Sequence, residues 1–70
     1  MRREPFDSTA IASAGYETET GTLEVEFTSG AVYRYRLVPA SVWRELRAAP
    51  SAGRYFSERI RDRYPAEWMP

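Results

Sequence analysis

The 70-residue chain contains no cysteine and no histidine. These absences exclude disulfide bonds, thiolate or imidazole metal sites, and the usual nucleophile–base pairs of hydrolases. No apolar run approaches the roughly 18 residues of a membrane-spanning helix, and no apolar h-region follows the first five residues. The sequence therefore predicts no metal, no small-molecule cofactor and no membrane contact, and it favours a cytoplasmic location.

Lysine is also absent, and all ten basic residues are arginine. The planar guanidinium group suits phosphates and stacked bases, so this composition is compatible with nucleic-acid contacts. A GC-rich genome, whose codons favour arginine, is the simpler explanation, because a pI of about 6.2 is far from that of a strongly basic nucleic-acid binder.

The net charge of zero conceals an asymmetry. Residues 1–30 hold two arginines and six acids, whereas residues 31–70 hold eight arginines and four acids.

The length of the chain allows one domain with a modest core. A chain of this size buries about 60% of the surface that its unfolded form exposes. Ten aromatic residues must supply much of that buried area. We expect a flexible lead at residues 1–7, a single domain over residues 8–64 and a tail at residues 65–70.

Alternating apolar and polar residues predict three antiparallel strands. The first, at residues 10–16, is a thin ribbon rich in alanine and serine. The second and third, at residues 22–28 and 31–38, carry opposite charges at their polar positions. Period-two alternation is typical of strands with one buried and one solvated face.

The side-chain pattern also predicts the register of the second hairpin. The apolar face would comprise Leu23, Val25, Phe27, Tyr33, Tyr35 and Leu37. These residues share a face only if the loop has three residues, with Gly30 in a left-handed conformation. Val25 then faces Tyr33, and Glu24 faces Arg34. The polar face would carry an ion-pair lattice of Glu24, Glu26, Arg34 and Arg36.

Two helices are expected after the strands. Pro39 suits a first helical position, and Pro50 ends that helix. Ser51 is a natural N-cap for a second helix that runs to about Arg63. The inward-facing stripes would be Val42, Trp43, Leu46 and Ala49 in the first helix and Phe56, Ile60 and Tyr64 in the second. The predicted fold is α+β: a three-stranded antiparallel meander followed by two helices on one face (β-β-β-α-α).

Several short motifs along the chain resemble those of the KTSC domain, which is named for its occurrence at the C-terminus of some lysyl-tRNA synthetases. They are Gly15-Tyr16, Leu23-x-Val25-x-Phe27, Ser29-Gly30, Tyr33-Arg34-Tyr35, Val38-Pro39, Ser51-x-Gly53-x-Tyr55-Phe56, Ile60-Arg61 and Tyr64. The resemblance covers about residues 7–64. The chain departs from the family pattern at Ala10 and Ser57, where we expect Asn, and at Glu17, where we expect Asp. The resemblance implies a small bacterial domain without an established activity, for which RNA binding is inferred from the synthetase association.

The central Tyr33-Arg34-Tyr35 motif has two interpretations. Aromatic residues on an exposed sheet stack on unpaired bases in common RNA-binding modules. The predicted register instead places Tyr33 and Tyr35 among apolar neighbours, so a buried, structural role is favoured.

The second helix is the better candidate for anion or RNA binding. Its candidate residues are Ser51, Gly53, Arg54, Tyr55, Arg59 and Arg61. The helix N-terminus presents N–H groups and a positive dipole end, and Gly53 permits close approach by a phosphate or by another backbone. The alternative, which is favoured, is an ordinary capped helix whose solvated face is partly neutralised by Glu58 and Asp62.

These observations predict a non-catalytic binding module, with RNA as partner through the resemblance. The alternative is a protein partner, or a homodimer, that uses the open edge of the first strand or an exposed Trp68. A third hypothesis is a histidine-independent ribonuclease built from Glu24, Glu26, Arg34 and Arg36. Paired surface charges explain that last pattern equally well, so no catalytic residue is assigned.

Overall fold

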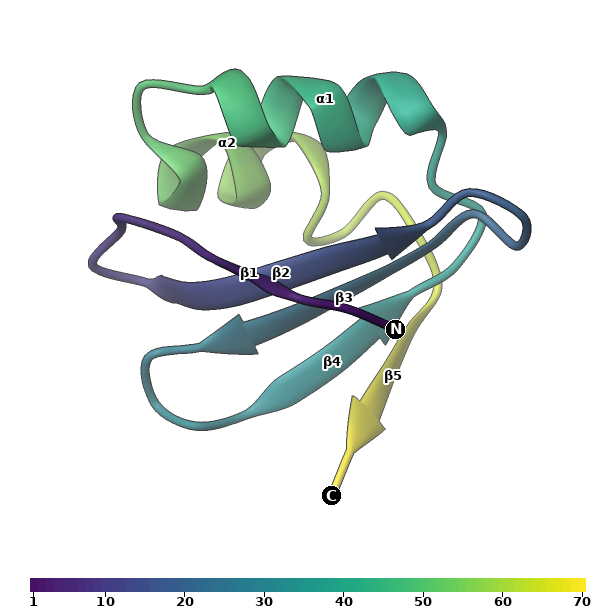
Figure 1. Ribbon diagram of the computed structural model, residues 1–70, viewed down its shortest axis with the longest axis horizontal. Coiled ribbons are helices and arrows are strands. Elements are labelled where there is room, and N and C mark those ends of the chain that lie inside the picture. The colour runs from purple at the N-terminus through teal and green to yellow at the C-terminus, as the bar shows by residue number, and fades with distance from the viewer.

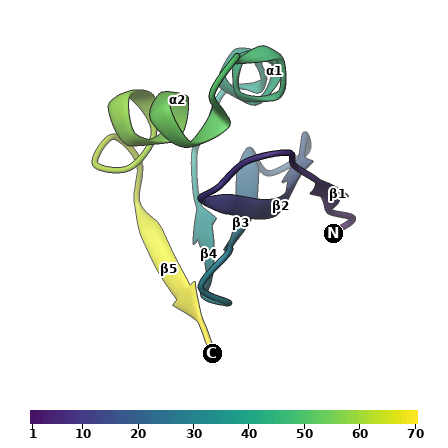
Figure 2. The same ribbon diagram turned by 90° about the vertical axis from the view of Figure 1, so that its left-hand side faces the viewer.

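Five antiparallel strands form one sheet, and two helices lie on one of its faces (Figures 1 and 2). The computed structural model describes residues 1–70. The elements in chain order are β1 (Glu4–Pro5), β2 (Ile11–Glu17), β3 (Thr22–Phe27), β4 (Val32–Tyr35), α1 (Ala40–Ala48), α2 (Ala52–Arg59) and β5 (Ala66–Met69). The strands are arranged in the sheet in the same order as in the chain, from β1 to β5. The α+β class and the placement of both helices on one face are confirmed.

The expectation of three strands is wrong, because two segments outside the alternating region also join the sheet. β1 pairs with β2, with Glu4 opposite Ala14, and β5 pairs with β4, with Trp68 opposite Tyr33. Residues 4–5 are therefore not a frayed lead, and the edge of the first predicted strand is covered rather than open. Strands of two and four residues are held by backbone pairing and are too short to show a recognisable side-chain period.

The predicted register of the β3–β4 hairpin is confirmed. Val25 pairs with Tyr33, and Glu24 pairs with Arg34. Gly30 has a φ of 97°, and the N–H of Gly30 donates to the carbonyl of Phe27 at 2.9 Å. A glycine in this conformation closes a three-residue loop without the steric penalty that a Cβ atom would bring.

β4 ends earlier than expected. Leu37 is not on the buried face: it lies outside the strand with a φ of 61°, and 73% of its surface is exposed. The left-handed residue turns the chain toward α1, while the N–H of Val38 donates to the carbonyl of Gly21 at 2.9 Å. The apolar pattern is therefore interrupted where the chain leaves the sheet for the helices.

The helices lie where the sequence signals predict them, with differences at their ends. α1 begins at Ala40, so Pro39 is its N-cap, with an extended backbone, rather than its first helical residue. α2 begins after Ser51, whose hydroxyl caps the helix, and it ends at Arg59 rather than near Arg63. The chain continues from Ile60 through a turn rather than a further helical turn.

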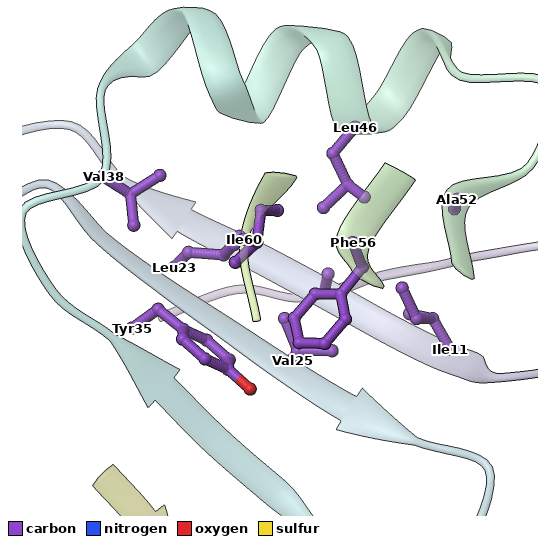
Figure 3. Packing of buried hydrophobic residues seen from close by; sticks show 10 residues of the cluster. Ile11, Leu23, Val25, Tyr35, Val38, Leu46, Ala52, Phe56 and Ile60 are labelled. Carbon is purple, nitrogen blue, oxygen red and sulfur yellow. The ribbon is translucent and has the colours of Figure 1, made fainter. Parts of the chain in front are cut away.

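The core lies between the helices and the central strands (Figure 3). Its buried residues are Ile11, Ala14, Leu23, Val25, Tyr35, Val38, Leu46, Ala52, Phe56 and Ile60. Both predicted helical stripes contribute, since Leu46 comes from α1 and Phe56 from α2. The helices cover the middle of the sheet better than its β5 end, where Trp68 is 61% exposed. Neither α1 nor α2 has the length and the apolar composition of a membrane-spanning helix.

Candidate functional site

The amino end of α2, the first predicted anion site, is capped and packed against the β1–β2 loop. The Ser51 hydroxyl accepts a hydrogen bond from the Arg54 N–H at 3.2 Å. Gly53 faces that loop closely, because a Cβ atom there would lie 3.2 Å from the Ala10 methyl group. Gly53 thus permits close approach by another part of the chain. A polar pocket of about 420 Å³ remains, lined by Asp7, Ser8, Thr9, Ala10, Pro50, Ser51, Ala52, Gly53, Arg54 and Ser57.

Two predicted binding side chains on α2 already have partners. The Arg54 guanidinium pairs with Glu58 one turn later at 3.2 Å. The Tyr55 hydroxyl donates to the Glu45 carboxylate of α1 at 2.8 Å. Burial, together with this hydrogen bond, raises the pKa of Tyr55 to about 12. These contacts join the two helices and favour a structural role for Tyr55.

The ten arginines divide into a paired and an unpaired group. Those in ion pairs with carboxylates are Arg3, Arg34, Arg36, Arg47 and Arg54. Three of the other five, Arg59, Arg61 and Arg63, lie close together at the end of α2 and in the turn that follows. All three are exposed, and Asp62 is the one acid among them. We call residues 59–63 the basic segment.

Aromatic side chains line a groove beside this segment, on the helix-bearing face of the sheet. The groove has a volume of about 480 Å³. It is lined by Phe27, Ser29, Ala31, Tyr33, Tyr35, Phe56, Arg61 and Ala66, which we call the aromatic groove. No acidic side chain lines it, and the Arg61 guanidinium lies 5.8 Å from the centre of the Phe56 ring. The groove therefore joins aromatic surface to an unpaired positive charge.

Edge-to-face contacts hold the two tyrosines of the groove. The Phe27 ring meets Tyr33 with centroids 6.0 Å apart, and the Phe56 ring meets Tyr35 at 5.3 Å. Burial raises the pKa of Tyr35, which is only 5% exposed, whereas Tyr33 is half-buried. Figure 3 shows the Tyr35 hydroxyl directed away from Leu23. The expectation that both rings face the apolar side is confirmed, and the groove lies over the part that the helices leave uncovered.

Trp68 extends this aromatic surface along β5. It lies directly opposite Tyr33 in the antiparallel pair, so both side chains are on the same face of the sheet. Residues 66–69 dock as a strand, yet the indole stays largely exposed. The sequence analysis places Trp68 in a tail and offers it as a contact for a protein partner, but it does not predict that residues 66–69 form a strand. The alternation of Ala66, Glu67 and Trp68 after Pro65 is the available signal, but Met69 interrupts it and three residues are too few to establish a period.

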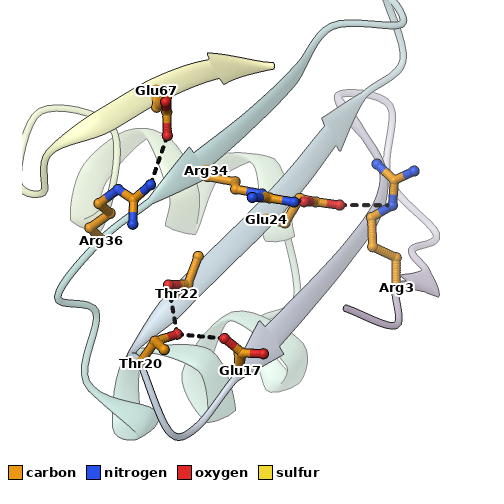
Figure 4. A network of polar contacts seen from close by, with 8 residues as sticks. All are labelled: Arg3, Glu17, Thr20, Thr22, Glu24, Arg34, Arg36 and Glu67. Atoms are coloured by element: carbon orange, nitrogen blue, oxygen red, sulfur yellow. Dashed lines mark hydrogen bonds and ion pairs between the residues drawn. The ribbon is translucent and has the colours of Figure 1, made fainter. Parts of the chain in front are cut away.

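The opposite face carries the charged residues of the ribonuclease hypothesis (Figure 4). Glu24 is buried between Arg34, at 2.8 Å, and Arg3, at 3.4 Å. The hydrogen bond from Arg34 to Glu24 raises the pKa of that arginine above its ordinary value. Arg36 instead pairs with Glu67 of β5 at 2.8 Å. The expected four-residue lattice therefore forms only in part.

Two further contacts complete the description of this polar face. Glu26 accepts a hydrogen bond from the Ser13 hydroxyl at 2.8 Å rather than pairing with an arginine. No group of three acidic, cysteine or histidine side chains is arranged to hold a metal ion. The polar face joins neighbouring strands through its side chains, which gives each charged group a structural partner.

Comparison with known proteins agrees with this architecture. The family model described as the KTSC domain matches residues 7–64. The chain belongs to the KTSC domain family. A KTSC domain protein from Yersinia pestis has a crystal structure that superposes with a TM-score of 0.96 at 29% sequence identity, and the match covers 99% of this chain and 97% of that one.

The KTSC domain also has relatives of two different lengths. A protein of Stutzerimonas stutzeri is 41% identical over 68 residues, which covers 97% of this chain and 96% of the relative. A lysine–tRNA ligase of Nostoc punctiforme is 41% identical over 63 residues, but this chain corresponds to only 11% of that protein. The KTSC domain thus matches both a protein of its own size and a small part of a much larger synthetase.

Two of the three positions at which we expect a departure from the family pattern lie together in this KTSC domain. Ala10 and Ser57 both line the polar pocket at the amino end of α2. That the family has asparagine at these two positions stays a prediction. Because Ser51 caps α2 and Arg54 pairs with Glu58, the basic segment and the aromatic groove, rather than that pocket, form the candidate site.

Proposed function

We propose that this KTSC domain is a non-catalytic module that binds RNA through the basic segment. The observation that carries the proposal is the group of three arginines, Arg59, Arg61 and Arg63, which have no carboxylate partner and lie beside an aromatic groove. Five of the remaining arginines form ion pairs with acidic side chains, which gives them a structural role. Unpaired guanidinium groups are free to contact phosphates, and phosphate contacts supply most of the affinity of such modules.

The relatives favour RNA over other polyanions as the partner. Lysine–tRNA ligases of Nostoc punctiforme and Trichormus variabilis contain a region similar to this chain, at 41% and 48% identity. A synthetase must hold tRNA, and an appended module with unpaired arginines is suited to add phosphate contacts. We assign that role to this chain only because its sequence is similar to that region of the two ligases.

The test is fluorescence anisotropy with labelled tRNA and with unstructured RNA over a series of salt concentrations. Three phosphate contacts predict a log–log slope of affinity against salt of about −2, because each contact on a single strand contributes about −0.7. Replacing Arg61 and Arg63 by alanine should reduce that slope by about two thirds. Arg44→Ala is the matched control, since Arg44 is also exposed and unpaired but lies on α1.

Two results would contradict the proposal. One is the absence of binding to either RNA at low salt, and the other is binding that does not respond to salt. Incubation of end-labelled RNA with the protein tests the non-catalytic assignment separately. Cleavage that disappears in a Glu24→Gln variant would instead support the histidine-independent ribonuclease.

A second candidate function is protein association through β5. Its outer edge has no neighbouring strand, and it carries the exposed Trp68. Unpaired edges and exposed aromatic side chains are common at protein interfaces. Sedimentation velocity over a wide range of protein concentrations tests self-association. A monomer at all concentrations would eliminate a homodimer through this edge.

A further inference from the structure

The aromatic groove is a feature that phosphate contacts alone do not explain. The helices bury Leu23 and Val25 of β3 completely, but the neighbouring Tyr33 of β4 is only half-buried. The strand beyond it, β5, brings Trp68 to the same face. Exposed aromatic surface therefore increases from the centre of the sheet toward its β5 edge.

The groove offers a ligand both flat surfaces and hydrogen-bonding groups. The Tyr33 and Tyr35 hydroxyls form no hydrogen bond within the protein, and no buried side-chain polar atom lacks a partner. Both hydroxyls therefore reach solvent at the groove. Their rings lie with centroids 6.4 Å apart and planes inclined by 30°, so they do not close the groove by stacking on each other.

The charge at the groove selects the kind of ligand. Arg61 is the one charged side chain in its lining, and it belongs to the basic segment. A ligand that places a planar ring on the aromatic side chains and a negative charge near Arg61 fits both properties. A nucleotide in an unpaired strand has this chemistry, because its base is free to stack while its phosphate lies at the adjoining backbone.

We propose that the aromatic groove binds unpaired bases of single-stranded RNA. Bases stack on Tyr33 in the groove and on Trp68, which lies opposite Tyr33 on the adjoining strand beside the groove, and a neighbouring phosphate contacts Arg61. This inference rests on the proposed RNA-binding function and adds a preference for single strands over duplexes. A base inside a duplex is already stacked and paired, so it cannot enter the groove. An apolar peptide is the competing occupant, but it would leave Arg61 without a partner.

The experiment compares single-stranded oligoadenylate and oligouridylate with an RNA duplex of the same length. Wild-type protein should bind the single strands more tightly, and its tryptophan fluorescence should be quenched on binding. Trp68→Phe, which keeps an aromatic ring, should abolish most of the quenching but retain most of the affinity. Trp68→Leu should weaken single-strand binding by about 5- to 150-fold, the range for losing one stacked base.

Two variants control for indirect effects. Trp68 is 61% exposed, so its replacement should leave the fold intact, which circular dichroism verifies. Leu37→Ala removes another exposed apolar side chain, outside the groove, and should bind single strands like the wild type. Tyr33→Leu tests the second stacking surface and should give a loss similar to that of Trp68→Leu.

The results separate this inference from the function on which it rests. Salt-dependent RNA binding that persists unchanged in Trp68→Leu and Tyr33→Leu, or equal affinity for single strands and duplexes, would overturn the groove assignment and leave the basic segment as the RNA contact. No binding to any RNA would overturn both proposals. Loss of self-association instead of RNA affinity in Trp68→Leu would assign this surface to a protein interface.

Discussion

Replacing Gly15 by alanine tests whether β1 is packed on β2 as the structure shows. Gly15 lies in the middle of β2, and a Cβ atom there would be 2.3 Å from the carbonyl oxygen of Arg2. Ordinary contacts of a Cβ atom begin near 3.4 Å, so the Arg2 backbone would have to retreat by about 1 Å. A backbone atom cannot relieve the clash by a change of rotamer. The amino-terminal segment must therefore move away from β2.

The cost follows from the contacts that this movement weakens. They include the pairing of Glu4 with Ala14, the hydrogen bond that the Phe6 N–H donates to the Ala12 carbonyl at 3.0 Å, and the ion pair of Arg3 with Glu24 at 3.4 Å. Each of the two backbone contacts contributes about 1 kcal/mol, and the ion pair, whose arginine is partly solvated, contributes about 0–1 kcal/mol. We therefore expect these losses to total about 2–3 kcal/mol.

A second effect of the Gly15→Ala substitution acts in the opposite direction and stabilises the protein. Gly15 is not among the residues with positive φ, so alanine can adopt its backbone conformation. At such a position, replacing glycine by alanine raises the free energy of unfolding by about 0.4–1 kcal/mol, because it lowers the conformational entropy of the unfolded chain. The net destabilisation should be about 1–2 kcal/mol. For a domain of this size that corresponds to a lower melting temperature by very roughly 4–16 °C.

Urea denaturation followed by tryptophan fluorescence measures this difference. Gly53→Ala is the matched control, since its added Cβ atom would meet a methyl group at 3.2 Å instead of backbone, and the helix gains from alanine. Its stability should change by less than that of Gly15→Ala. In a double-mutant cycle, Arg3→Ala should cost less in the Gly15→Ala background than in the wild type. A Gly15→Ala protein as stable as the wild type, or more so, would refute the packing of β1 on β2.

Three other substitutions test separate features of the fold. Ser51→Ala removes the cap that accepts the Arg54 N–H, and it should lower the free energy of unfolding by about 1 kcal/mol in urea denaturation, whereas an unchanged midpoint would show that the cap is dispensable. The pKa of Tyr55 is about 12 in the folded protein against an ordinary 10.0, so stability should be intact below pH 10 and fall as pH rises toward 12. Tyr55→Phe should show a smaller fall over that range, and equal falls in both proteins would contradict the contact with Glu45. Leu37→Gly should raise stability by about 1 kcal/mol, because it removes left-handed strain from a side chain that is 73% exposed, and a lower urea midpoint would refute this explanation.

The hairpin shows how far local sequence determines tertiary structure. Alternation in β3 and β4, together with Gly30, leaves only one register that keeps both apolar faces on the same side, and Val25 is opposite Tyr33 as predicted. Ser51 likewise signals the start of α2 from a local hydrogen bond. These features follow from the sequence because the groups involved are neighbours in the chain or in one hairpin.

The candidate site could be predicted only in part, for a related reason. The orientation of Tyr33 follows from strand alternation, but its partial exposure depends on how far α2 extends over the sheet. The sequence predicts Arg59 and Arg61 as candidates, yet their lack of acidic partners depends on where every carboxylate lies in space. The sequence also predicts a binding role for Tyr55, and only the fold brings Glu45 of the other helix to its hydroxyl.

The amino acid sequence by itself thus determined the α+β class, the central hairpin, the helix starts and the inward direction of the two tyrosines. Only the tertiary structure decided that β1 and β5 complete the sheet, that the first predicted strand has no free edge, and that Trp68 lies opposite Tyr33. The physical reason is the range of the interactions. Alternation and capping act between nearby residues, whereas β1 and β5 are held by backbone hydrogen bonds to β2 and β4, which leave almost no trace in the side-chain pattern.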